Sequence, residues 1–295
     1  MSPLALPPDM RSRLRRLSLV PRRATTLTGA GAHASRNRGG GLEFAQYRAY
    51  ERGDDLRQVD WKLYARSDRF FVRDAERESP LALWIVIDAS ASMAQTDVAR
   101  PDWSRFDAAR RIAAGLMEIA LRQGDRFGVV VEAGDGPLII EPGAGPRHRD
   151  QVLLALGRLH AGGVGSWARD MAAFGGKMGR SDLIVLLTDG FDEGCIDAAE
   201  QLARSGRDLC LIQILTADER DFPFDHGHRF RDVEGGAEVL GDGRAMRDDF
   251  LARFAEARAA LDARLDALGV RHAAHFIDQP ADQPIRDLFR TGGRR

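Results

Sequence analysis

Two aspartates in this sequence each follow a run of apolar residues. Asp88 comes after residues 81–87 and opens an Asp-x-Ser-x-Ser pattern with Ser90 and Ser92, and Asp189 ends a second apolar run. Carboxylate and hydroxyl oxygens are the ligands that Mg²⁺ prefers in proteins. The pattern therefore predicts a site for Mg²⁺ or Mn²⁺. The alternative is a strand-to-helix turn in which an Asp or Ser side chain caps a helix.

The elements around the two aspartates must bring them close together. A short apolar run rich in β-branched residues is typical of a strand that is buried on both faces of a parallel sheet. The carboxyl ends of such strands meet at one edge of the sheet, where open α/β sheets bind ligands. Two carboxylates at close range repel, so one takes up a proton unless a cation or an Arg lies between Asp88 and Asp189. This repulsion favours a bound ion.

Strand and helix patterns alternate along the rest of the chain. The expected strands are residues 126–131, 137–140, 182–188, 208–215 and 270–277, with a hairpin over 230–240. The expected helices, several with apolar stripes at three- and four-residue spacing, are residues 104–123, 149–160, 196–204, 244–268 and 285–290. This order predicts an α/β fold with a doubly wound, mostly parallel sheet and helices on both faces. Residues 137–140 are expected as an antiparallel edge strand.

The first 41 residues have a different character. They contain eight Arg and one acidic residue, Asp9, and residues 29–41 are rich in Gly. We expect residues 1–41 to form a flexible Arg-rich arm, with one amphipathic helix over residues 10–17. The arm either contacts an acidic partner, a phosphate group or a membrane surface, or is a solvated helix and linker.

Residues 42–80 are expected to form an N-terminal β-rich segment, a hairpin packed on a main domain at 81–290. Charged and aromatic residues alternate densely here, a composition typical of binding surfaces. The candidate partner-binding residues are Arg48, Asp54, Arg57, Asp60, Trp61 and Arg66. The alternative is an Arg–carboxylate network that holds the hairpin against the main domain.

The same stretch carries a family resemblance. The residues that carry it are Glu43-Phe44, Arg48-x-Tyr50, Gly53-Asp54, Arg57, Val59-Asp60-Trp61 and Ala65-Arg66, followed by the Asp-x-Ser-x-Ser strand. Together they resemble the domain-of-unknown-function 58 family, whose members contain a von Willebrand factor A-like domain. The resemblance implies a metal-ion-dependent adhesion site at Asp88, Ser90 and Ser92, with Asp189 hydrogen-bonded to a metal-bound water. It also implies a bacterial adaptor for a MoxR-type AAA+ ATPase in assembly or maturation of other proteins.

One loop departs from the pattern of that domain. Its usual Gly-Gly-Thr sequence supplies a Thr hydroxyl to the metal, whereas this chain has Val164 at the Thr position. A Val side chain has no oxygen and cannot bind a metal ion. Ser166 lies two residues later and is the candidate substitute.

Composition narrows the class of protein. The chain has 295 residues, a net charge of −1 and two cysteines, Cys195 and Cys210. The near-neutral charge gives no general attraction to nucleic acid, and two cysteines provide no disulfide framework. No apolar run reaches the roughly 20 residues that span a bilayer. We therefore expect a cytoplasmic protein without a transmembrane segment.

The sequence is compatible with three functions. A non-enzymatic protein-binding module is favoured, because the sequence lacks phosphate-loop and dinucleotide motifs and shows no readable Ser–His or Cys–His pair. A metal-independent scaffold with a degenerate site is the alternative suggested by Val164. A Mg²⁺-dependent phosphohydrolase using Asp88 and Asp189 is less favoured, since Ser90 stands where such enzymes carry a second Asp that shuttles protons.

Overall fold

The computed structural model describes residues 4–21, 46–50, 59, 61–67, 69–74, 82–134, 136–163, 166–231 and 238–290. The chain divides into two compact units. One is formed by residues 1–27 together with 81–295, and the other by residues 28–80. The larger unit contains both aspartates of the predicted site.

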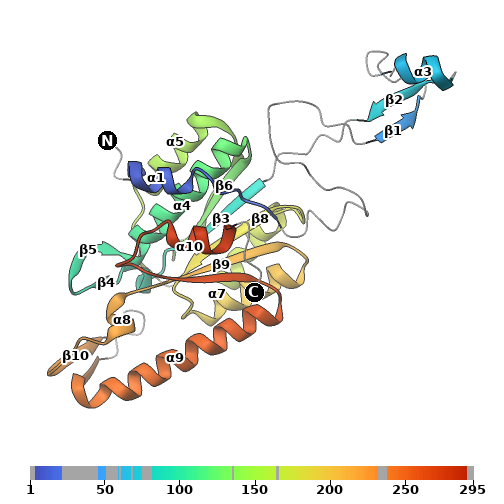
Figure 1. The fold of residues 1–295 in the computed structure, drawn as a ribbon. Helices are drawn as coiled ribbons and strands as arrows, with labels where there is room; N and C mark the ends of the chain where they lie inside the picture. Colours follow the sequence, from blue (N-terminus) through green and yellow to red (C-terminus); the bar gives the residue numbers. More distant parts are fainter. Residues whose placement is uncertain are drawn as a thin grey trace. The chain divides into compact units, whose positions relative to one another are not determined.

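A six-stranded sheet forms the centre of the larger unit (Figure 1). Its strands are β3 (Ala82–Asp88), β6 (Arg126–Glu132), β7 (Leu138–Gly143), β8 (Leu183–Thr188), β9 (Asp208–Leu215) and β12 (Arg271–Phe276). The order across the sheet is β12-β9-β8-β3-β6-β7, and all neighbours are parallel except β7, which runs antiparallel at one edge. The predicted doubly wound α/β fold and its antiparallel edge strand are confirmed.

The direction of winding reverses beside β3. From β3 the chain proceeds outward to β6 and β7, and it then returns to the other side of β3 to form β8, β9 and β12. A reversal of this kind leaves a crevice at the carboxyl ends of the two strands that flank it, which is where doubly wound sheets bind ligands. Asp88 ends β3 and Asp189 directly follows β8. The topology therefore brings the two aspartates to the same crevice.

Alternate residues of the strands face two separate cores. In β3, Leu83, Ile85 and Ile87 belong to one apolar cluster, while Trp84 and Val86 belong to the other. The first cluster is covered by helices α1 (Pro8–Leu14), α4 (Arg105–Gln123), α5 (Gly145–Leu156) and α10 (Gln283–Phe289). The second is covered by α6 (Trp167–Phe174), α7 (Glu193–Arg204) and the end of α9 (Gly243–Ala267). Burial on both faces explains why the strands are continuously apolar.

Helix α4 directly follows a short hairpin. The hairpin consists of β4 (Thr96–Asp97) and β5 (Arg100–Ser104), after a 3-10 turn at Ala91–Ala94. Ser104 caps the helix in a reciprocal capping box with Asp107, and Gly124 ends it with a φ of 78°. Arg105 is thereby the first residue of α4. The hairpin was not expected from the sequence, since its strands are short and polar.

The N-terminal segment is not a flexible arm over residues 4–21. Leu14 is 0% exposed and Met10 3% exposed, and both belong to the core that α4 and α10 enclose. Arg13 also forms two hydrogen bonds with the buried carboxylate of Asp282, at 2.8 and 2.7 Å. The prediction failed because the apolar residues of this helix alternate with arginines that reach outward or pair with a distant acid.

The smaller unit contains the expected hairpin. Strands β1 (Gln46–Ala49) and β2 (Phe71–Asp74) pair antiparallel, and α3 (Trp61–Ser67) lies between them in sequence. The predicted packing of this hairpin on the main domain stays a prediction.

The remaining elements belong to the larger unit. They are α8 (Ala217–Asp221), the 3-10 turn Gly175–Lys177, and the antiparallel pair β10 (Gly227–Arg231) and β11 (Glu238–Asp242), which precedes α9. Within the described ranges, no helix combines the length and apolar character needed to cross a membrane.

Candidate functional site

Asp88 lies at the carboxyl end of β3 and is 0% exposed. Its Oδ1 accepts a hydrogen bond from the Ser90 N–H at 2.9 Å, and its Oδ2 accepts one from the Thr188 hydroxyl at 2.8 Å. In the described part of the chain, no Arg, Lys or His forms an ion pair with this carboxylate. Asp88 is therefore a buried acid held only by neutral donors.

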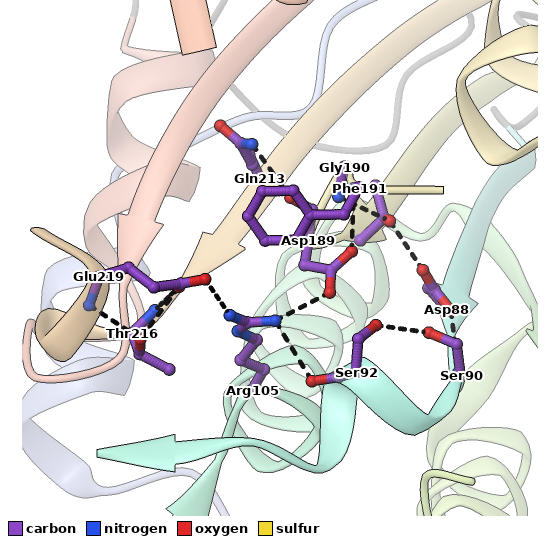
Figure 2. Close-up of polar contacts among 11 residues, drawn as sticks. Asp88, Ser90, Ser92, Arg105, Asp189, Gly190, Phe191, Gln213, Thr216 and Glu219 are labelled. Carbon is purple, nitrogen blue, oxygen red and sulfur yellow. Dashed lines mark hydrogen bonds and ion pairs between the residues drawn. The ribbon is translucent and has the colours of Figure 1, made fainter. Parts of the chain in front are cut away.

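The two serines of the motif lie beside each other. The Oγ atoms of Ser90 and Ser92 are 3.0 Å apart and hydrogen-bonded, and both residues are at least nine-tenths buried. The strand end and the 3-10 turn that starts at Ala91 place both hydroxyls on one side of the loop. Figure 2 shows them below the carboxylate of Asp88, at the end of the strand. The Asp-x-Ser-x-Ser pattern thus gathers three oxygen groups in one place.

Asp189 reaches the same crevice from β8. Its Oδ1 accepts the Phe191 N–H at 3.1 Å, and its backbone carbonyl accepts a hydrogen bond from Gln213 Nε2 at 3.0 Å. Gly190, between Asp189 and Phe191, has a φ of 78°, a backbone conformation that residues with a side chain rarely adopt. This turn fixes the carboxylate and leaves the ring of Phe191 49% exposed at the rim.

Arg105 is the ion-pair partner of the Asp189 carboxylate, as Figure 2 shows. Its Nη1 donates to Asp189 Oδ2 at 2.8 Å and to the Ser92 carbonyl at 3.2 Å, and its Nη2 donates to Glu219 Oε1. The Arg105 side chain is 1% exposed. The repulsion between the two aspartates can be relieved by a bound cation or by an Arg. In the structure, Arg105 pairs with Asp189.

The two aspartates consequently differ in charge balance. Burial and, to a lesser extent, the nearby charge of Asp189 together raise the pKa of Asp88 to about 6. Arg105 lies against Asp189, and not against Asp88, in the ion pairs of the described residues. Among the described residues, Asp189 therefore has a cationic partner, which it shares with Glu219, and Asp88 has none.

The chemical groups at Asp88, Ser90 and Ser92 are of the type that binds a divalent cation. They offer one carboxylate and two hydroxyls, all hard oxygen donors, beside a buried negative charge that has no cation of its own in the described part of the chain. Asp189 does not fit the expected role in the same way, because its Oδ2 accepts a hydrogen bond from Arg105. The residues that would hold Mg²⁺ or Mn²⁺ are thus Asp88, Ser90 and Ser92.

The loop expected to complete the site lies against it. The Gly162 N–H donates to the Ala89 carbonyl at 2.8 Å, and the Ala91 N–H donates to the Gly163 carbonyl at 3.0 Å. Val164 lies outside the described residues. Ser166 precedes α6, and its N–H donates to the buried Glu132 Oε1 at 2.8 Å. Its role as a ligand stays a prediction.

Glu132 is a further buried acid near the site. It ends β6 and is 0% exposed. Burial, together with smaller effects of the Asp170 and Asp88 carboxylates, raises its pKa to about 7. Asp170 itself has a lowered pKa, chiefly through its hydrogen bond from Arg169. A Glu directly after three valines was the signal in the sequence, since it ends a strand beside β3.

The sequence reasoning also missed Arg105, Thr188 and Glu219. Arg105 had one detectable signal: it is a basic residue directly after a helix cap, where the helix dipole favours acids. Glu219 is the closing residue of a capping box with Thr216 at the start of α8. Both lie far from Asp189 in sequence, so only the fold reveals that they meet there.

The predicted partner-binding residues all belong to the smaller unit. Trp61 is 57% exposed, and Arg66 is exposed on the same helix. The rings of Tyr64 and Phe70 stack at 4.4 Å between centroids, and Trp61 meets both edge-on. Arg48 lies in β1, while Asp54, Arg57 and Asp60 lie outside the described residues. The described part of this surface is aromatic and exposed.

Comparison with known proteins gives three kinds of match. A family model described as "Protein of unknown function DUF58" matches residues 46–260. Uncharacterized protein Mb1516 of Mycobacterium bovis is 27% identical over 263 residues, covering 87% of this chain and 81% of that protein. Uncharacterized protein Rv1480 of Mycobacterium tuberculosis gives the same values.

Two solved structures match part of the chain at low similarity. The conserved hypothetical protein BatB from Bacteroides thetaiotaomicron is 15% identical with a TM-score of 0.39, covering 64% of this chain and 98% of that one. The SpRpn10 VWA domain is 15% identical with a TM-score of 0.39, covering 71% and 93%. The family model spans most of the chain and includes the strand that ends at Asp88. This chain therefore belongs to the DUF58 family.

Proposed function

We propose that this protein is a non-enzymatic protein-binding module whose Asp88 site takes Mg²⁺ or Mn²⁺. The observation that carries the proposal is the buried Asp88 carboxylate, which lies beside two paired hydroxyls and has no ion pair among the described residues. A divalent cation would balance this charge and supply open coordination positions at the rim. An acidic group on a partner protein is the matching ligand for such a position.

The chain's own residues have separate tasks in this proposal. Asp88 supplies the charge, and Thr188 and the Ser90 N–H hold its two oxygens in place. Ser90 and Ser92 supply neutral oxygens. Phe191, exposed at the rim, offers an apolar contact beside the site. None of these tasks requires a proton transfer.

The proposed partner is a MoxR-type AAA+ ATPase. This part rests on the resemblance to the family and on the two-unit organisation, in which the smaller unit presents Trp61 and Phe70 to solvent. Exposed aromatic residues are frequent anchors of protein interfaces. The adaptor would then use both units in assembly or maturation of another protein.

The first experiment is a calorimetric titration of Mg²⁺ and Mn²⁺ into the chain and into Asp88→Ala. Saturable binding that the substitution abolishes supports the metal site. Asp150→Ala, an exposed acid on α5, is the matched control and should bind as the wild type does. Equal binding in wild type and Asp88→Ala would contradict the assignment.

The second experiment tests the partner and the alternatives. The tagged chain is mixed with a purified MoxR-type ATPase in Mg²⁺ and in chelator. Capture only in Mg²⁺ supports the proposal, and equal capture in both favours a metal-independent scaffold. Turnover of a generic phosphoester that is lost in Asp88→Asn would instead favour a phosphohydrolase.

A further inference from the structure

Arg105 has an unusual position for a basic residue. It is the first residue of α4, where the partial positive charge of the helix end disfavours a cation. Its guanidinium is nevertheless 1% exposed. A buried cation persists only when carboxylates and carbonyls surround it. Asp189, Glu219 and the Ser92 carbonyl provide that surrounding.

The contact with Asp189 has a consequence for the site. Arg105 Nη1 lies 2.8 Å from Asp189 Oδ2, and it also reaches the backbone of Ser92, one of the proposed ligand residues. A guanidinium in this place both withdraws a carboxylate oxygen from the crevice and adds a positive charge beside it. Both effects oppose the binding of a second cation there.

We propose that Arg105 is a built-in counter-ion that withholds Asp189 from the cation site and thereby limits the affinity of the site for divalent metal ions. The inference rests on the proposed function, since it assumes that Asp88, Ser90 and Ser92 form such a site. Arg105 sets the affinity of the site in this view: Asp88 alone supplies charge to the metal ion, and removal of the guanidinium releases a second carboxylate. The number of charged ligands is a main determinant of affinity at oxygen-ligand sites.

Glu219 holds Arg105 in place from the other side. Its Oε2 accepts from the Thr216 hydroxyl at 2.9 Å and from the Thr216 N–H at 2.8 Å, which closes the cap of α8, and its Oε1 accepts from Arg105. The carboxylate is therefore fixed by the helix start and cannot follow the guanidinium freely. Substitution of Glu219 together with Arg105 removes one charge of each sign, which allows a charge-balanced test.

The test compares Mg²⁺ and Mn²⁺ binding to wild type, Arg105→Gln and Arg105→Lys by calorimetry. We expect Arg105→Gln to bind at least about tenfold more tightly, because a second carboxylate becomes available. Arg105→Lys keeps the charge and should bind as the wild type does. Unchanged or weaker binding in Arg105→Gln would overturn the proposal.

A stability readout separates this role from a purely structural one. Arg105→Gln should have a lower Tm in chelator, since it leaves buried carboxylates unpaired, and Mg²⁺ should restore more of the loss than it adds to the wild type. The control is Arg13→Gln. This substitution breaks an ion pair with the fully buried Asp282, the residue directly before α10. Its Tm should also fall, without recovery in Mg²⁺. Equal recovery in both variants would refute the role of Arg105.

A charge-balanced variant covers the case in which Arg105→Gln does not fold. Arg105→Gln with Glu219→Gln retains the fold more readily, and tighter metal binding in this variant supports the proposal while unchanged binding overturns it. The outcomes also separate the two proposals. Metal binding by the Arg105 variant but not by the wild type upholds the inference and contradicts the metal-dependent function of the native chain. Absence of binding in every variant overturns both.

Discussion

Asp88 is a buried acid whose ionisation opposes folding. Its pKa of about 6 exceeds the ordinary 3.8, so the folded state binds a proton more tightly than the unfolded state does. The contribution of Asp88 to wild-type stability should therefore fall as the pH rises from about 4 to about 6. In chelator at pH 7.5, we expect Asp88→Asn to raise the free energy of unfolding by up to about 3 kcal/mol. Urea unfolding at pH 4.5 and 7.5 measures this difference.

The comparison for Asp88→Asn is Asp150→Asn, whose carboxylate is exposed on α5. This control should change stability by less than about 0.5 kcal/mol at either pH. A lower stability of Asp88→Asn at pH 7.5 would show that the carboxylate is already compensated in the metal-free protein.

His275 is a buried base with the opposite kind of shift. It is 1% exposed, its two ring nitrogens make no hydrogen bond to described residues, and burial lowers its pKa to about 4. Between about pH 6.5 and 4 the unfolded state binds the proton and the folded state does not, so the contribution of His275 to stability falls as the pH drops through this window. His275→Leu should remove up to about 3 kcal/mol of this loss.

Thermal unfolding from pH 7 to pH 4.5 measures the contribution of His275. The exposed His226 is the matched control, and His226→Gln should retain the wild-type pH slope. An unchanged slope in His275→Leu would mean that other groups, such as the paired carboxylates, account for the acid sensitivity.

At the scale of elements, the start of α4 positions both a helix and a charge. The Asp107 N–H donates to the Ser104 Oγ at 3.1 Å, and the Ser104 N–H donates to Asp107 Oδ2 at 3.0 Å. Ser104→Ala should lower the free energy of unfolding by about 1 kcal/mol. It should also speed amide exchange at the first turn, where Arg105 begins. Ser104→Thr keeps the hydroxyl, so equal losses in the two variants would exclude the cap as the cause.

At the scale of the whole molecule, the N-terminal segment closes the core between α4 and α10. Leu14 is 0% exposed, whereas Arg16, two residues later, is exposed. We expect Leu14→Ala to cost about 3 kcal/mol of unfolding free energy through the cavity that it leaves. Arg16→Ala should change it by less than about 0.5 kcal/mol. Urea unfolding of both variants measures this difference. If Leu14→Ala leaves the free energy of unfolding unchanged, the result would support the flexible arm that the sequence predicted.

The core of the larger unit was predictable because its signals are local. A strand buried on both faces must be apolar along its whole length, so residues 82–88 and 183–188 are evident from the sequence. Alternation of strands and helices then fixes a parallel, doubly wound sheet. Since the carboxyl ends of adjacent parallel strands share one edge, Asp88 and Asp189 follow as neighbours.

The charge balance of the site was decided by the tertiary structure alone. Arg105 and Glu219 are 114 residues apart, and no local pattern states that they meet at Asp189. The same holds for Arg13 and Asp282, which turn a seemingly solvated basic segment into part of the core. Apolar periodicity depends on neighbours within a few residues, and the sequence carries it directly. Ion pairs between distant segments depend on which elements the sheet order places side by side, so only the folded chain reveals them.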